Sequence, residues 1–417
     1  MATAFKLDTP PPVASLRIAE SSWWTDNTFT PVFERMRAED PVNLTEEGDF
    51  APYWSVTRHE DIVHVEALPD LYSSSWELGG ITVVSDGLES LPEGREPLPM
   101  FIAMDRPEHT GQRRTVAPAF TPSEMTRLAV EVRARTQEVL DSLPVDEPFD
   151  WVDKVSIELT TGMLAILFDF PWEDRRLLTH WSDWAGDIES FKDQARGDER
   201  WKVLWECAAY FTRLWQGRAA KGEAPDLISR MIHSDATKNM TPQEYLGNLI
   251  LLIVGGNDTT RNTMSGLAMV ATDYRDEWAK IVADPKLIPN AAQELIRWQT
   301  PLAHMRRTTT QDVELGGKQI PAGSKVVLWY MSGNRDESVF PNAEAFIADR
   351  PNARRHLAFG YGIHRCVGAR LAELQIAILM EEMIARGLRP EVVGEPDRVV
   401  SSFVHGVRSM QTVLRKA

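Results

Sequence analysis

The chain has 417 residues, 43% of them hydrophobic, which is enough for one large domain or for two or three ordinary ones. Its formal net charge of −16 argues against nucleic acid and anionic membranes as main partners. The two cysteines, Cys207 and Cys366, are too few for a disulfide framework and favour a reducing compartment. Because no run of about 18 apolar residues occurs, we expect no membrane span and a cytoplasmic protein.

From the N-terminus, residues 1–20 are expected to form a loose arm and residues 21–417 a single domain, because neither a repeat nor a break in composition divides them. Apolar residues have helical spacing over 27–38 and 58–68, and alternate as in a strand over 54–57. Residues 70–100 hold glycines, prolines and the apolar run 81–84. Long loops of this kind in compact domains tend to be functional.

Helices dominate the rest of the pattern. Residues 107–117 are predicted to start a helix with His109 and Arg113 on one face, and 121–215 is mostly helical. Thr241 as N-cap, Pro242 at N1 and Glu244 as capping-box residue predict a helix that reaches about residue 272. We further expect a helix over 290–298, strands over 313–320 and 325–330, a helix from 371 that ends near 386–387, and short strands in the tail. The predicted fold class is mainly α with small β-sheets.

Cys366 lies in the glycine-rich stretch 356–370, directly before an apolar helical run over 371–384. A thiolate needs hydrogen-bond donors and positive charge to stay ionised, and a turn that enters a helix N-terminus offers free N–H groups and the helix dipole. Glycines also let the backbone pass close to a large flat ligand. These features favour a cysteine that ligates haem iron over the alternative, a buried structural cysteine.

The complete pattern Phe359-Gly360-x-Gly362-x-His364-x-Cys366-x-Gly368 resembles the haem-binding signature of cytochrome P450. The resemblance implies the P450 fold, a single large domain with a long central helix crossing the haem. It implies haem b (iron protoporphyrin IX) as cofactor, Cys366 as metal ligand, and Phe359, Gly360 and Gly368 as cofactor contacts. It also implies a monooxygenase that uses O2 and two electrons to hydroxylate an unactivated C–H bond.

The long helix predicted from residue 241 contains Gly255-Gly256, followed by Asp258 and Thr259. Paired glycines are costly inside an apolar helix, so the helix either ends there or opens locally. Because helical spacing resumes over 263–271, we expect a local opening. The segment resembles the oxygen-activating segment of the family, which implies that Thr259 is the alcohol beside the bound oxygen and Asp258 the acid that brings protons from solvent.

Glu294 and Arg297 lie three residues apart on a predicted helix, a spacing that alone is typical of a solvated surface pair. Their order ahead of Arg350 and Cys366 resembles the structural triad of the family. The resemblance implies that Glu294, Arg297 and Arg350 hold the fold around the cysteine.

Haem also brings two propionates, and buried carboxylates need cations or donors. The family pattern implies four residues for these contacts: His109, Arg113, Arg307 and His364. Arg306 is the alternative to Arg307, since the spacing varies by one residue in such proteins.

Residues 254–262, 304–307 and 402–406 resemble the soluble bacterial alkane hydroxylases of this superfamily. That resemblance implies terminal (ω) hydroxylation of a medium-chain alkane or fatty acid. The alternatives are the same chemistry on a steroid, terpene or macrolide, and a non-catalytic haem-binding protein, which has no need of the Asp258–Thr259 pair. The predicted walls of an apolar substrate pocket are Ile81, Val83, Leu251, Leu252, Gly255, Leu302, Met305 and Phe403.

The chain ends soon after Cys366, so we expect no flavin domain in it and electrons from separate proteins. The resemblance implies a ferredoxin and a flavin-dependent ferredoxin reductase. A basic patch of Arg113, Arg114, Arg365 and Arg370 on the cysteine side is predicted to receive the ferredoxin. The expected state is a monomer with a hydrophobic small-molecule substrate.

Overall fold

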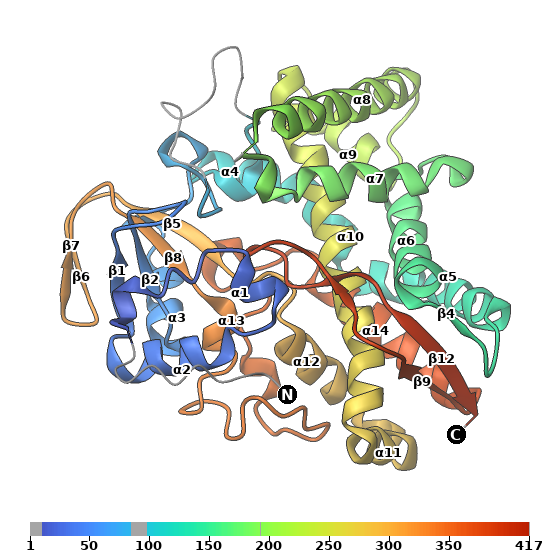
Figure 1. The fold of residues 1–417 in the computed structure, drawn as a ribbon. Helices are drawn as coiled ribbons and strands as arrows, with labels where there is room; N and C mark the ends of the chain where they lie inside the picture. Colours follow the sequence, from blue (N-terminus) through green and yellow to red (C-terminus); the bar gives the residue numbers. More distant parts are fainter. Residues whose placement is uncertain (1–10, 85–97, 192, 417) are drawn as a thin grey trace.

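A computed structural model describes residues 11–84, 98–191 and 193–416. One long helix, α10 (Pro242–Asp273), runs through the middle of the molecule (Figure 1). It contacts α6 (Glu158–Phe168), α7 (Arg176–Ala185), α8 (Gln194–Ala219), α12 (Ile288–Gln299), α14 (Ala369–Ala385) and β9 (Leu388–Val392). This arrangement confirms the predicted fold class, mainly α with small sheets.

The sequence around residue 241 explains where α10 begins. The Thr241 hydroxyl accepts the N–H of Glu244 at 3.2 Å, and the Glu244 carboxylate accepts the N–H of Thr241 at 2.8 Å, which is the predicted capping box. The predicted local opening at Gly255-Gly256 is wrong, because the helix is continuous there. A Cβ on Gly256 would lie 2.6 Å from Cδ2 of Leu164, so this glycine permits close approach of α6.

The largest sheet has the strand order β1-β2-β8-β5-β3. Its strands are β1 (Val42–Thr45), β2 (Tyr53–Val56), β8 (Lys325–Leu328), β5 (Met305–Thr309) and β3 (Tyr72–Ser73). Only the β2–β8 pair is parallel among these described strands. In β5, Arg307 pairs with Val326 and Arg306 with Val327, so their side chains point to opposite faces.

Three smaller sheets complete the β structure. The single strand predicted over 313–320 is instead a hairpin of β6 (Val313–Leu315) and β7 (Lys318–Ile320). Gly316 and Gly317, with φ of +57° and +74°, make the tight turn, a conformation that favours glycine. The second small sheet has the strand order β4 (Pro148–Asp150), β12 (Gln411–Lys416) and β9. The third pairs β10 (Asp397–Arg398) with β11 (Val407–Ser409).

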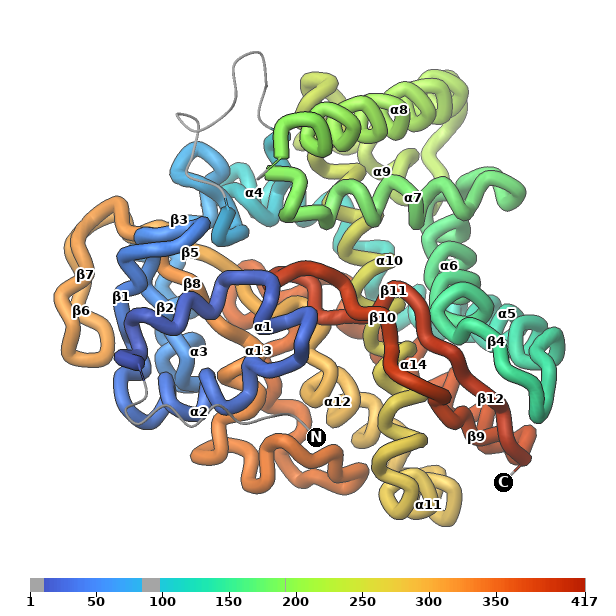
Figure 2. The backbone as a smooth tube through the Cα atoms, viewed as in Figure 1, coloured from blue at the N-terminus to red at the C-terminus, as the bar shows by residue number. Residues whose placement is uncertain are grey.

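The remaining helices surround this frame. They are α1 (Ser22–Thr25), α2 (Thr30–Glu39), α3 (His59–Ala67), α4 (Glu108–Val116), α5 (Pro122–Ser142), α9 (Leu227–His233), α11 (Arg275–Ala283) and α13 (Tyr330–Gly333). Figure 2 shows α7, α8 and α9 at one end of α10 and α11 at the other. Within the described ranges, no helix combines the length and apolar character needed to cross a membrane.

The N-terminal segment is packed where the structure describes it. Val13, Leu16 and Ile18 are buried in one hydrophobic cluster with Trp24 and Trp329. Residues 11–20 are therefore not the loose arm that we expected, because their apolar side chains are buried by packing on the core. Residues 1–10 of that arm and 85–97 of the predicted 70–100 loop lie outside the described residues, and the domain boundary at residue 20 stays a prediction.

Candidate active site

A largely apolar cavity lies between α10 and the loop that carries Cys366. Its walls come from α4, α6, α10, β5, the cysteine loop and α14. Five of the predicted pocket residues line it: Leu251, Leu252, Gly255, Leu302 and Met305. Apolar walls with a few convergent polar groups are typical of a cofactor or small-molecule site.

The other three predicted pocket residues do not line this cavity. The carbonyl of Ile81 accepts the N–H of Arg306, which ties this segment to the sheet. Val83 is fully buried in the N-terminal core cluster. Phe403 packs against the ring of His304, with centroids 5.3 Å apart. Val83 and Phe403 are buried in the core and Ile81 packs partly buried against it, and hydrophobicity alone could not distinguish these places from a pocket wall.

Cys366 lines the cavity between the short turn Gly362–His364 and the start of α14. Its own N–H donates to the carbonyl of Phe359 at 2.8 Å, which closes the loop. Phe359, Gly360 and Gly368 also line the cavity. Gly360 has φ of +65°, a conformation that favours glycine.

The thiol of Cys366 is accessible from the cavity, yet protein atoms surround it closely. Burial raises its pKa, and the N–H of Gly368 with the guanidinium groups of Arg113 and Arg365 act in the opposite direction. Burial outweighs these groups, so the loop alone leaves the thiol protonated at neutral pH. A coordinated metal ion deprotonates a thiol outright, and the N–H of Gly368 would then stabilise the thiolate.

Two histidines and two arginines predicted for the propionates line one side of the same cavity: His109, Arg113, Arg307 and His364. The rings of His109 and His364 lie 4.3 Å apart between centroids. Burial and nearby arginines lower the pKa of His109 to about 4 and that of His364 to about 2, so both rings are neutral at pH 7.

The ring nitrogens of these two histidines indicate which kind of ligand the site binds. All four are buried, and none has a hydrogen-bond partner in the described part of the chain. Buried polar groups in native proteins are almost always hydrogen-bonded, so the site suits a ligand that carries acceptors. Haem propionates meet that need beside the cations of Arg113 and Arg307, and the residues present therefore fit haem.

Strand geometry distinguishes the two candidate arginines of β5. Arg307 lines the cavity, whereas Arg306 faces a separate surface hollow and donates to the carbonyl of Leu78 at 3.1 Å. Arg307 also forms an ion pair with Glu66 at 3.0 Å, a partner that the sequence did not indicate. Arg307 is thus the member of the pair that can reach a ligand in the cavity.

On α10, Thr259 lines the cavity and its hydroxyl donates to the carbonyl of Gly255 at 2.9 Å. Asp258 points away from the cavity and is buried. Its Oδ1 accepts the Ser182 hydroxyl at 2.7 Å and lies 3.1 Å from Nη2 of Arg261. Burial raises the pKa of Asp258, and the positive charge of Arg261 opposes that rise.

Arg261 extends this network toward solvent. Its Nη1 lies 2.7 Å from Oδ1 of Asp183, whose side chain is 53% exposed. Asp258 is therefore linked to the surface through one guanidinium group. Arg261 stands in the glycine-rich motif of α10, but no sequence signal connected it with Ser182 or Asp183, because α7 meets α10 only in the folded chain.

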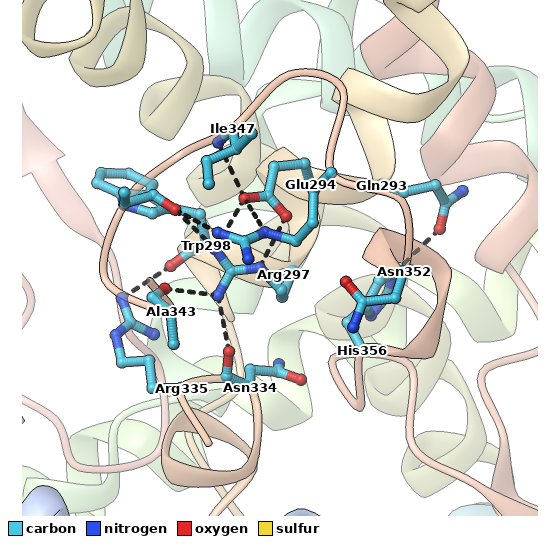
Figure 3. Close-up of polar contacts among 12 residues, drawn as sticks. Gln293, Glu294, Arg297, Trp298, Asn334, Arg335, Ala343, Ile347, Asn352 and His356 are labelled. Atoms are coloured by element: carbon cyan, nitrogen blue, oxygen red, sulfur yellow. Dashed lines mark hydrogen bonds and ion pairs between the residues drawn. The ribbon is translucent and has the colours of Figure 1, made fainter. Parts of the chain in front are cut away.

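The three residues of the predicted triad meet at one buried point. Glu294 and Arg297 are both 0% exposed and form a paired contact at 2.7 and 2.8 Å. Arg350 reaches Oε1 of Glu294 at 2.8 Å. Arg297 also donates to the carbonyls of Asn334 and Ala343, which ties the segment before the cysteine loop to α12 (Figure 3).

Comparison with known protein families places these features in context. The family model described as Cytochrome P450 matches residues 279–386, the span from the middle of α11 to the end of α14. Linalool 8-monooxygenase of Pseudomonas putida is 34% identical over 395 residues, 94% of this chain and 97% of that protein. Methyl-branched lipid omega-hydroxylase of Mycobacterium tuberculosis (strain ATCC 25618 / H37Rv) is 31% identical over 427 residues, 96% of each chain.

Solved structures resemble the chain more strongly. Cytochrome P450-153 from Novosphingobium aromaticivorans is 56% identical with a TM-score of 0.90, and the match covers 96% of this chain and 99% of the other. CYP153D17 from Sphingomonas sp. PAMC 26605 is 60% identical with a TM-score of 0.90, covering 95% and 98% of the two chains. Both similarities extend over nearly the whole length.

Proposed function

This chain belongs to the cytochrome P450 family, is a monooxygenase and binds haem b, and on that premise we propose that it hydroxylates the terminal carbon of a medium-chain alkane or fatty acid. The observation that carries the proposal is the cavity. Among the described residues that line it, Arg113 and Arg307 carry charged side chains, and both are proposed haem contacts. The remaining walls are mainly apolar and suit an alkyl chain.

In this proposal Cys366 is the iron ligand, and His109, Arg113, Arg307 and His364 hold the propionates. Haem, when bound, supplies the oxygen-activating chemistry. Apolar residues of α6 and α10 exclude water and orient the alkyl chain, which keeps the reaction from releasing reduced oxygen unproductively. Gly255 leaves open space beside Thr259, since nothing lies within 4 Å of where its Cβ would be.

Proton supply is proposed to pass through the network of α10. Thr259 offers a hydroxyl to the reacting side of the cavity, and Asp258 holds a proton at Oδ1 or Oδ2 behind it. Arg261 and Asp183 link Asp258 to solvent, and Ser182 holds its carboxyl group in place. Burial raises the pKa of Asp258, so this carboxyl group holds a proton to a higher pH than an ordinary aspartate, which suits a proton donor.

Members of the family take electrons from redox partners, and we propose a ferredoxin and a flavin-dependent reductase for this chain. Arg114, Arg365 and Arg370 are exposed on the cysteine side, which suits an acidic partner. Arg114→Glu and Arg370→Glu should slow electron transfer most at low salt, whereas Lys202→Glu on α8 should not. A monomeric, cytoplasmic protein is part of the same proposal.

Oxidation of a terpene is the second candidate, because one relative bears the name Linalool 8-monooxygenase. The experiment that separates the two uses dodecane, dodecanoate and linalool. Each is titrated into the haem-loaded protein while the haem spin state is followed by absorbance. Products are then analysed with a surrogate ferredoxin and reductase. Terminal alcohol from dodecane or dodecanoate supports the proposal, and subterminal products or a response to linalool alone would overturn it.

The absorption spectrum of the reduced CO complex tests the cysteine independently of substrate. A Soret band with the thiolate red shift is expected, and Cys366→His should abolish the shift while haem is retained. A band without the shift in the unmodified protein would reject Cys366 as the iron ligand.

A further inference from the structure

Glu66, near the C-terminal end of α3, is a buried carboxylate with no part in the function proposed above. Its side chain is 1% exposed. Oε1 accepts hydrogen bonds from Nη2 of Arg307 at 3.0 Å and from the hydroxyl of Tyr330 at 2.5 Å. Oε2 has no hydrogen-bond partner of good geometry in the described chain, although the N–H of Tyr361 is close enough to lower the pKa of the carboxyl group. Glu66 therefore depends on Arg307 as its counter-ion.

Glu66 also lies directly against the cysteine loop. A Cβ on Gly360 would be 3.2 Å from the hydroxyl oxygen of Tyr330 and 3.5 Å from Oε1 of Glu66. A Cβ on Gly362 would be 2.3 Å from the carbonyl oxygen of Glu66. Both glycines have φ of +65°. Two positions of the loop that carries Cys366 are thus free of side chains where that loop packs on Glu66 and Tyr330.

Arg307 has a carboxylate on one side and the active-site cavity on the other. Arg307 and Tyr330 line the cavity together with Cys366. Glu66 lies behind them and lines a different hollow at the surface, with Arg106, Gly362 and other residues. The one positive charge of Arg307 consequently serves both Glu66 and any carboxylate bound in the cavity.

The charge of Glu66 affects any redox centre that binds in the cavity. Burial raises the pKa of Glu66 above its ordinary value, and the charge of Arg307 and the Tyr330 hydroxyl limit that rise. The Arg307 guanidinium, 3.0 Å from Oε1, and the Tyr330 hydroxyl both favour the ionised carboxylate over the neutral acid. A fixed negative charge near a redox centre opposes the gain of an electron, and more strongly in a protein interior than in water.

We propose that Glu66 is a positioning residue that holds Arg307 and Tyr330 at the haem edge, and that its negative charge lowers the reduction potential of the haem. Because Glu66 already neutralises Arg307, the single charge of Arg307 does not also neutralise a haem propionate, and the local charge stays negative. This inference rests on the proposed haem-binding roles of Cys366 and Arg307, and it is independent of the proposed substrate.

The test is the midpoint potential of the haem-loaded protein, measured by spectroelectrochemistry on Glu66→Gln and the unmodified chain. Gln has nearly the same shape, accepts from Tyr330 and carries no charge. The expected result is a midpoint potential more positive than that of the unmodified chain. Glu314→Gln, a change of the same kind at an exposed position of β6, is the matched control and should leave the potential unchanged. An unchanged or more negative potential in Glu66→Gln, or an equal shift in Glu314→Gln, overturns the proposal.

Tyr330→Phe leaves the Glu66 side chain in place and removes one of its two donors. It should shift the potential in the same direction but by less, because part of the Glu66 population then becomes protonated. If Glu66→Gln does not retain haem, the midpoint potential of Tyr330→Phe decides the question. An unchanged potential in Tyr330→Phe then overturns the proposal. The reduced CO spectrum is recorded on every sample. Absence of the thiolate shift in the unmodified chain would reject the proposed function, whereas a normal spectrum with an unchanged potential rejects only the role of Glu66.

Discussion

Arg297→Lys tests whether the buried triad holds the protein together. Arg297 uses all its donors: two bonds reach Glu294, and three reach the carbonyls of Asn334, Ala343 and Ala345 at 2.7 to 3.0 Å. Lysine keeps the charge but has only three donors at one nitrogen, so at least two acceptors lose their partner. Each buried acceptor left unsatisfied costs about 1–3 kcal/mol, so two of them cost about 2–6 kcal/mol. We expect a loss of about 2–6 kcal/mol in the free energy of unfolding.

The assay is urea unfolding of the haem-loaded protein, followed by tryptophan fluorescence and by haem absorbance. The midpoint should fall while the slope of the transition stays the same. Arg127→Lys is the matched control, because Arg127 pairs with Glu124 at the same spacing on α5 but is 52% exposed. Its cost should stay below about 1 kcal/mol. Equal losses in the two variants, or a loss under about 1 kcal/mol in Arg297→Lys, would refute the reasoning.

Three further predictions concern α10 and the buried histidines. Asp258→Asn should slow product formation by about 10²-fold and divert electrons to peroxide, while haem binding is unaffected. The diversion is measured as the amount of product formed per reduced nicotinamide consumed. Gly255→Ala should stabilise the protein by up to about 1 kcal/mol, because the new Cβ contacts nothing. Gly256→Ala should stabilise it less or destabilise it, because the new Cβ clashes with Leu164. Thermal unfolding of both variants measures the difference. Burial lowers the pKa of His304 to about 4 from an ordinary 6.5, so the unfolded state binds this proton first as pH falls. Stability present above about pH 6.5 should be lost between about pH 6.5 and 4, by up to about 1.4 kcal/mol per pH unit from this group, and His304→Gln should flatten that slope in urea titrations.

Short sequence patterns predicted the helix ends that are determined by residues close in sequence. The capping box at Thr241 and the glycine after Arg386 placed the ends of α10 and α14 within a residue or two, because caps involve neighbours in sequence. Two errors of secondary structure came from glycine pairs. Gly316-Gly317 turns a hairpin instead of lying within a strand, and Gly256 makes room for α6 instead of opening its helix. Glycine signals a special backbone or a close contact, and one sequence does not say which.

By itself, the sequence indicated the chemistry that we propose for the loop around Cys366, since this pattern is contiguous and each position has a local reason. It also specified the residue types of the triad and of α10. Only the tertiary structure decided which side chains share a cavity. It placed Arg307 rather than Arg306 in the cavity that Cys366 lines, put Ile81, Val83 and Phe403 outside that cavity, and brought Glu66 from α3 against the cysteine loop. These outcomes depend on strand register and on helices that meet across the fold, and spacing along the chain carries no record of such contacts.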